Sequence, residues 1–84
     1  MRLHPNVSMA DTADGTVLLH QRTGRYWQLN TTGSRVLHRL LDGETPQGIA
    51  AGLVTDHGID PRRAEQDVRA VIGQLRTADL VVAS

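Results

Sequence analysis

The alternation of apolar and polar residues over the first third of the chain predicts three short strands. Apolar residues alternate in Val7-Ser8-Met9, and the β-rich run 16–20 follows the turn dipeptide Asp14-Gly15. A second turn over residues 22–24 precedes the segment 25–29, which we expect to form the third strand. Because tight turns join neighbouring antiparallel strands, the pattern predicts an antiparallel sheet.

The rest of the chain predicts three helices. Each opens at a residue whose side chain can cap it, and the last two place proline directly after that cap. The capping residues are Asn30 or Thr31, Thr45 and Asp60, and the helices end at Gly43, Gly58 and about Ala78. A short apolar segment, 80–82, is expected to dock on the core. We therefore predict an α+β fold of the winged helix-turn-helix kind, with the sheet followed by three helices, in one domain over residues 1–84.

The third predicted helix carries a wide apolar stripe, which covers about 120° at about 100° per residue. The stripe consists of Ala64, Val68, Val71, Ile72, Leu75 and Ala78. Its basic edge, beside Ile72, consists of Arg62, Arg69 and Arg76, spaced seven residues apart. Asp67 and Gln74 lie on the opposite edge. Two interpretations stay open: all six apolar residues belong to the core, or the core shares them with a groove.

Composition narrows the classes of function. The chain has 84 residues with nine basic and nine acidic side chains, zero formal net charge and no cysteine. A neutral chain has no general attraction to nucleic acid or to anionic membranes, so we expect neither as a partner. Residues 1–10 lack the apolar run of a secretory signal, and without cysteine no disulfide is possible. These features favour a cytoplasmic protein.

No residue pattern indicates catalysis or a bound cofactor. The serines do not lie in a G-x-S-x-G motif, and the glycines form neither a G-x-G-x-x-G fingerprint nor a phosphate-binding loop. Four histidines occur, His4, His20, His38 and His57, but none is paired with another at i, i+4. We therefore predict a protein without enzymatic activity, without a cofactor and without a metal site.

The last two predicted helices leave DNA binding as an alternative, because they resemble a helix-turn-helix with its turn at Gly58-Ile59. The residues that would then face phosphates are Arg62, Arg63, Arg69 and Arg76. Residues 65–67 are Glu-Gln-Asp, however, where a recognition helix needs base-reading side chains. The neutral charge of the chain also argues against this alternative.

The third predicted strand is an edge strand, and it carries the only two aromatic residues of the chain. Tyr26 and Trp27 are adjacent, so their rings point to opposite faces, with Leu29 on the face of Trp27 and Gln28 on that of Tyr26. The unpaired N–H and C=O groups of an edge can bind an extended peptide as an added strand. We predict such binding through Arg25 to Leu29.

The third helix is expected to close the same groove. Ile72 would offer an apolar pocket between Arg69 and Arg76 if this helix packs beside the third strand. The full set of residues predicted to contact the peptide is Arg25, Tyr26, Trp27, Gln28, Leu29, Asp67, Val68, Arg69, Val71, Ile72, Leu75 and Arg76.

The chain also resembles a known family. The stretch 17–30, which contains Gly-Arg-Tyr-Trp-Gln-Leu-Asn, is followed by Thr32-Gly33 and by Leu-Leu-Asp-Gly at 40–43, and this pattern resembles the PqqD-like peptide-recognition elements. Within that group it is most similar to the short, free-standing proteins of lasso-peptide pathways. The resemblance extends to Asp67-Val68 and Leu75 on the third helix and to the closing Leu80-Val81.

The resemblance implies a non-catalytic protein that binds the leader region of a ribosomally made precursor peptide. In the family the leader adds as an antiparallel strand to the third strand, in a cleft closed by the third helix. The implied partners are a leader with a Tyr-x-x-Pro segment, a cysteine protease subunit that removes the leader, and a downstream cyclase. A PqqD-like chaperone of another peptide-modification pathway is the nearest alternative.

Two residues depart from the family pattern. Leu37 stands where members often have a large aromatic residue, which affects the expected depth of the cleft. Asp79 stands where many members have glycine, which implies that aspartate occupies a left-handed backbone position.

Overall fold

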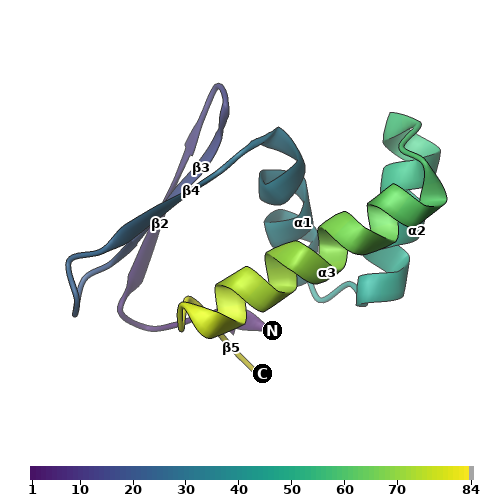
Figure 1. Cartoon of the computed structure of the whole chain (residues 1–84). Coiled ribbons are helices and arrows are strands. Elements are labelled where there is room, and N and C mark those ends of the chain that lie inside the picture. The colour runs from purple at the N-terminus through teal and green to yellow at the C-terminus, as the bar shows by residue number, and fades with distance from the viewer. Residues whose placement is uncertain (84) are drawn as a thin grey trace.

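The computed structural model describes residues 1–83 of the chain (Figure 1). Its strands are β1 (Arg2–Leu3), β2 (Val7–Thr12), β3 (Gly15–His20), β4 (Tyr26–Leu29) and β5 (Val81–Val82). Its helices are α1 (Thr31–Leu41), α2 (Pro46–His57) and α3 (Pro61–Thr77). The predicted α+β order, a three-stranded antiparallel sheet followed by three helices, is confirmed.

The three-stranded sheet has the order β2-β3-β4, and Leu18 of β3 pairs with Trp27 of β4. Its first turn requires glycine, because Gly15 has φ +151° and a Cβ there would overlap the carbonyl oxygen of Leu29. The close approach of these two backbones fixes where β4 ends against β3. The register of β4 therefore depends on Gly15, which the sequence pattern indicates only as part of a turn.

The two ends of the chain form a second, two-stranded sheet. Arg2 pairs with Val82 and Leu3 pairs with Val81, so β1 and β5 are antiparallel. The docking of the apolar segment 80–82 was predicted, but its pairing with the N-terminal residues was not. Strands of two residues are too short to show a period in the sequence, and this pairing joins residues from opposite ends of the chain.

The helices begin and end where the sequence predicts. The side chains of Asn30, Thr45 and Asp60 each accept hydrogen bonds from backbone N–H groups of the first helical turn. Gly58 ends α2 in the left-handed conformation, with φ 63°. Within residues 1–83, none of the helices combines the length and the apolar character that a membrane-spanning segment needs.

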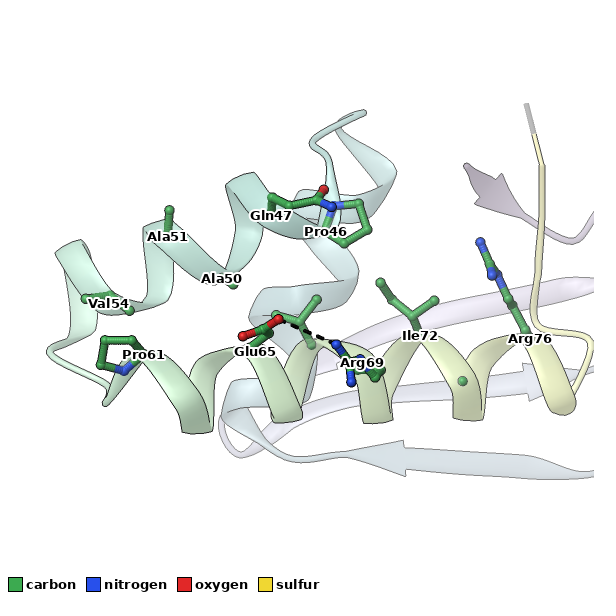
Figure 2. Close-up of a pocket in the computed structure, with 12 residues that line it drawn as sticks. Pro46, Gln47, Ala50, Ala51, Val54, Pro61, Glu65, Arg69, Ile72 and Arg76 are labelled. Carbon is green, nitrogen blue, oxygen red and sulfur yellow. Dashed lines mark hydrogen bonds and ion pairs between the residues drawn. The ribbon is translucent and has the colours of Figure 1, made fainter.

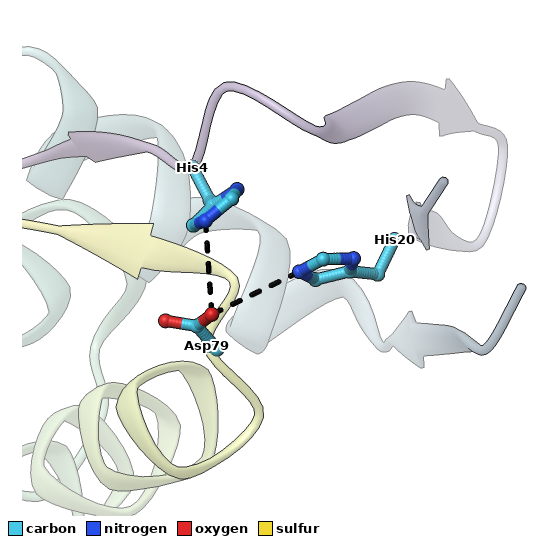
Figure 3. A group of neighbouring side chains, drawn as sticks. All are labelled: His4, His20 and Asp79. Atoms are coloured by element: carbon cyan, nitrogen blue, oxygen red, sulfur yellow. Dashed lines mark ion pairs between the residues drawn. The ribbon is translucent and has the colours of Figure 1, made fainter. Parts of the chain in front are cut away.

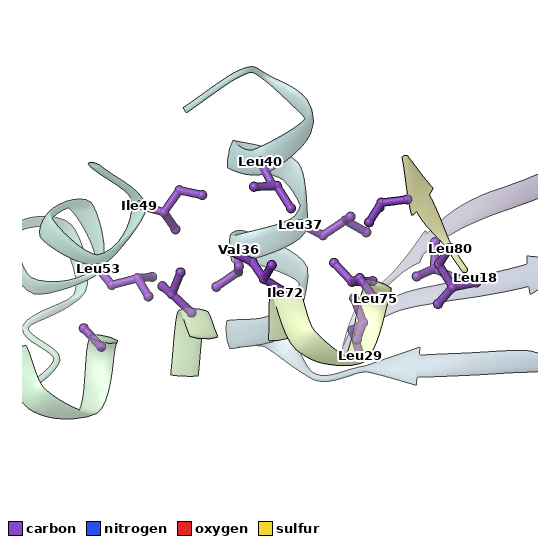
Figure 4. Close-up of a cluster of buried hydrophobic side chains, with 13 residues drawn as sticks. Leu18, Leu29, Val36, Leu37, Leu40, Ile49, Leu53, Ile72, Leu75 and Leu80 are labelled. Atoms are coloured by element: carbon purple, nitrogen blue, oxygen red, sulfur yellow. The ribbon is translucent and has the colours of Figure 1, made fainter. Parts of the chain in front are cut away.

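The core lies where the helices pack on one face of the sheet (Figure 4). Its largest fully buried side chains include Leu18, Leu37, Ile49, Leu53, Leu75 and Leu80. Four residues of the α3 stripe are buried, Ala64, Val68, Ile72 and Leu75, whereas Val71 and Ala78 are half-buried against the core. The stripe therefore serves mainly as core, and Ile72 and Val68 also border a groove, as described below.

A polar cluster holds α1 against the sheet. One carboxylate oxygen of Asp11 accepts hydrogen bonds from the Thr16 hydroxyl at 2.8 Å and from Nε2 of His38 at 2.9 Å. The Thr16 hydroxyl also shares a hydrogen bond with Ser34. The bonds from His38 and Thr16 lower the pKa of the Asp11 carboxyl below its ordinary value of 3.8.

A second polar contact joins α1 to α2. The guanidinium of Arg39 donates to the Asp56 carboxylate at 2.7 Å and lies 3.8 Å from that of Glu44. The bond to Asp56 raises the pKa of Arg39 above its ordinary value. The guanidinium of Arg39 lies close against Gly52 of α2, where an added Cβ would make this flexible group shift. This contact helps to hold α2 against α1.

Candidate functional site

The outer side of β4 is a free sheet edge. Within residues 1–83 the sheet has the order β2-β3-β4, and β4 has a hydrogen-bonded neighbour on one side only. The His20 N–H donates to the Arg25 carbonyl at 2.9 Å, and antiparallel pairing then alternates along the strand. By this alternation Trp27 and Leu29 point their backbone groups toward β3. The N–H and C=O groups of Tyr26 and Gln28 point to the free edge.

The side chains of β4 divide between the two faces of the sheet as predicted. Trp27 is half-buried and Leu29 is buried, and both pack against the core. Tyr26 is 72% exposed and Gln28 is also exposed. Arg25, just before β4, places its guanidinium 5.4 Å from the centroid of the Trp27 ring, within the range of a cation–π contact.

A cavity of about 370 Å³ separates the beginning of β4 from the C-terminal half of α3. Its lining consists of Arg25, Trp27, Gly73, Gln74, Thr77 and Ala78. The structure thus places a cavity between β4 and α3, where the peptide groove was predicted, with Arg25 and Trp27 in its wall. The three residues of α3 and its C-cap Ala78 were not among the predicted contacts.

A larger groove, about 600 Å³ in volume, lies on another side of α3, against α2 (Figure 2). The predicted residues Val68, Arg69, Ile72 and Arg76 line this groove together with residues of α2. The structure therefore places Ile72, with Arg69 and Arg76, in this groove and not in the lining of the cavity beside β4, where the sequence led us to expect them. Two residues of the basic edge, Arg69 and Arg76, line the groove against α2, whereas Arg62 does not.

Three further predicted residues of α3 line neither cavity, and neither do Tyr26, Gln28 and Leu29 of β4. Leu75 is fully buried in the core, and Val71 is half-buried against it. Asp67 lies 3.9 Å from Nε of Arg63, one helical turn earlier. The sequence did contain a signal for the side of α3 that lines the cavity beside β4, since Gln74 lies on the edge of the stripe opposite the arginines. A single helix cannot show which of its edges faces a strand, because that depends on tertiary packing.

Comparison with known proteins assigns a family to this fold. Residues 15–81 match the family model described as coenzyme PQQ synthesis protein D (PqqD). The chain belongs to the PqqD family. The match spans β3, β4 and all three helices, and therefore every residue that lines the cavity between β4 and α3. A search of curated proteins found no significant match to this PqqD-family chain.

Two solved structures resemble the PqqD-family chain over nearly its whole length. One is lasso peptide synthetase B1 complexed with the leader peptide, with 38% identity, a TM-score of 0.87 and coverage of 98% of this chain and 96% of that one. The other is TbiB1 in complex with the TbiA(beta) leader peptide, with 30% identity, a TM-score of 0.85 and coverage of 100% and 98%.

The two departures from the PqqD-like pattern have different structural consequences. Leu37 is fully buried in the core and lines neither cavity. Asp79 has φ 58°, so aspartate does occupy a left-handed backbone position directly after α3. The first departure therefore changes core packing, and the second places a carboxylate where glycine would have no side chain.

The Asp79 carboxylate faces two histidines that the sequence did not bring together (Figure 3). Its Oδ2 lies 3.7 Å from Nε2 of His4 and 3.9 Å from Nε2 of buried His20. The Asn6 N–H donates to Nδ1 of His4 at 3.0 Å, so neutral His4 carries its proton on Nε2. That proton points to Asp79, and a metal ion at this nitrogen would require the opposite tautomer. The cluster therefore fits a polar contact between chain segments better than a metal site.

Proposed function

We propose that this PqqD-family chain binds the leader region of a ribosomally made lasso precursor peptide. The observation that carries the proposal is a free edge at β4 beside a cavity against α3, in a chain 38% identical to a protein solved with a leader peptide. A leader segment would add to β4 as an antiparallel strand. Main-chain hydrogen bonds would supply affinity, and side-chain pockets would supply specificity.

The residues of β4 would have different roles in leader binding. The outward backbone groups of Tyr26 and Gln28 would hold the leader strand, because the register leaves them without a partner on the sheet. Trp27 would form the apolar wall for a leader side chain, and Arg25 would border it. On the α3 side, we assign leader contact to the residues that line the cavity. Leader contacts to Asp67, Val71 and Leu75 remain predictions.

We further infer that the chain presents the bound leader to other proteins and performs no chemistry itself. The inferred partners are a cysteine protease subunit that removes the leader and, downstream, a cyclase. Strand addition at β4 would leave β2, the other edge of the sheet, and the exposed face that carries Tyr26 open to such partners. The wild-type chain would bind a leader peptide without cleaving it.

Fluorescence anisotropy with two labelled peptides tests the proposal. One peptide carries a Tyr-x-x-Pro segment, and in the other alanine replaces both named residues. We expect the replacement to weaken binding at least about tenfold, because it removes the side chains that would fill the cavity. Equal binding of both peptides would remove the lasso assignment and favour another peptide-modification pathway. Failure of both peptides to bind would remove leader recognition itself.

A salt series separates this function from DNA binding. Contacts to phosphates weaken steeply as salt increases, whereas main-chain hydrogen bonds depend on salt much less. Two of the α3 arginines already lie near carboxylates, Arg63 near Asp67 and Arg69 near Glu65. We therefore expect peptide binding to persist at high salt and duplex DNA to bind weakly even at low salt.

A further inference from the structure

The two cavities beside α3 meet at one residue. Gly73 lines both the cavity between β4 and α3 and the groove between α2 and α3, and it is exposed to solvent. About one helical turn after Gly73, Arg76 lines the α2–α3 groove and Thr77 lines the cavity between β4 and α3. A chain that leaves β4 can therefore reach the α2–α3 groove by crossing α3 at Gly73.

The packing of this chain does not explain a glycine at position 73. The residue lies within α3, where glycine is less favourable than alanine. A Cβ at this position would meet no atom within 4 Å, so no neighbour excludes a side chain. Because glycine has no side chain, the exposed surface of α3 is depressed at this position, between the two cavities. A backbone could pass there in close contact with α3.

The α2–α3 groove is lined by apolar side chains that the core buries only in part. Residues 46–55 of α2 carry no charge, yet only Ile49 and Leu53 of this helix are buried in the core. Ala50 and Val54 are half-buried and line the groove with Ile72. An apolar surface of this kind on both walls is typical of a site that a partner covers.

The charges of the groove indicate the chemistry of its occupant. The Arg76 guanidinium has no hydrogen-bond or ion-pair partner within residues 1–83, whereas Arg69 lies 3.5 Å from a carboxylate oxygen of Glu65. A free guanidinium at the rim favours a partner with a carboxylate. A second copy of this chain fits less well, because a two-fold contact would place the same arginine-bearing rim on both sides.

The direction of the added strand decides which part of the leader reaches the groove. A strand antiparallel to β4 passes Leu29 first and Arg25 last. Arg25 lines the cavity together with Gly73, so the C-terminal end of the strand leaves beside the crossing point. A helix about 10 Å across is spanned by three or four extended residues at about 3.3 Å each. The segment just after the strand can therefore reach the groove.

On the basis of the function proposed above, we propose that the precursor segment C-terminal to the added strand crosses α3 at Gly73. It then places apolar side chains between α2 and α3, with an acidic residue beside Arg76. The α2–α3 groove is thus a second subsite for the same peptide. It would select precursors by the sequence that follows the strand-forming segment.

Three synthetic peptides test this subsite by fluorescence anisotropy. The core peptide holds only the strand-forming segment with Tyr-x-x-Pro. The second adds about eight residues at its C-terminus, rich in leucine with one glutamate, which is long enough at about 3.3 Å per residue to cross the helix. The third carries the same addition at its N-terminus. We expect the C-terminal extension to bind about tenfold more tightly than the core peptide and the N-terminal extension to bind like the core peptide.

Variants of the chain test which residues cause the tighter binding of the C-terminally extended peptide. Ala51→Glu and Arg76→Glu change only the α2–α3 groove, and both should abolish the gain while core-peptide binding stays constant. Gly73→Leu should also abolish it by blocking the crossing point. Arg62→Glu, the same charge change outside both cavities, should preserve the gain. Circular dichroism and melting temperature confirm that each variant is folded.

The outcomes distinguish this inference from the function on which it rests. If both extensions bind like the core peptide, the subsite is refuted and leader recognition stands. A gain that persists in Ala51→Glu and Arg76→Glu, or one that the N-terminal extension shares, also refutes the subsite. If the core peptide itself does not bind, leader recognition at β4 fails.

Discussion

The guanidinium of Arg25 lies over the ring of Trp27, 5.4 Å from its centroid, at the mouth of the cavity between β4 and α3. The charged group therefore covers an aromatic surface that an added leader strand would contact. Arg25 is exposed, whereas Trp27 is half-buried against the core. The pair combines an exposed charged rim with a half-buried apolar wall, which suits a pocket for one peptide side chain.

Replacement of Trp27 tests this pocket. Trp27→Leu keeps an apolar side chain toward the core but removes most of the ring surface, and we expect leader affinity to fall at least about tenfold. Tyr26→Ala is the matched control, because Tyr26 lies on the other face and is 72% exposed. It should change affinity less than about threefold, since the backbone at residue 26 stays in place. Anisotropy measures both. Equal losses in the two variants would contradict the assignment of Trp27 to the pocket wall.

Gln28 tests whether the leader binds through backbone hydrogen bonds. The N–H of Gln28 points to the free edge, so proline at this position removes a bond to the leader without removing one to β3. We expect Gln28→Pro to abolish measurable leader binding while the protein still unfolds cooperatively on heating. Gln28→Ala, which keeps the N–H, should bind normally. If Gln28→Pro binds as tightly as the wild type, the leader does not add to β4.

The sequence was sufficient to predict β4 as an edge strand with Trp27 and Leu29 on its inner face, because the evidence there is local. The turn before Arg25 and the alternation of Trp27 and Leu29 with exposed residues both lie within a few positions of the strand. The helix side of the site required the structure. The stripe on α3 has two polar edges, one with Arg69 and one with Gln74, and only the packing of α3 on the rest of the fold shows that Gln74 faces β4.

The same limit applies to the rest of the fold. Helix ends were predicted because capping residues such as Asn30 and Asp60 act on their own first turns. The pairing of β1 with β5, and the approach of His4 and His20 to Asp79, join residues far apart in the chain. No short-range pattern reports such contacts, so a single sequence does not reveal them.

The contact between Gly15 and Leu29 predicts a large effect of a small substitution. Gly15→Ala would place a Cβ against the Leu29 carbonyl, and φ +151° is unfavourable for any residue with a side chain. Because the obstacle is backbone, the strands must separate, and we expect a loss of at least about 2 kcal/mol in the free energy of unfolding. Urea denaturation measures this loss. Gly24→Ala is the control, since it has a positive φ of 74° but no atom near its Cβ.

The cluster of Asp11, Thr16 and His38 predicts how stability depends on pH. The hydrogen bonds from His38 and Thr16 lower the pKa of the Asp11 carboxyl in the folded state below 3.8. A lowered carboxyl pKa adds stability above the unfolded-state pKa, and this contribution is lost as pH falls through the folded-state pKa. Asp11→Asn, which resembles the protonated form, should therefore melt at a lower temperature than the wild type at pH 6. The difference should close as pH falls below about 3.8, the ordinary carboxyl value. Melting curves from pH 2 to pH 6 measure it, and a difference independent of pH would show that the charge of Asp11 has no role.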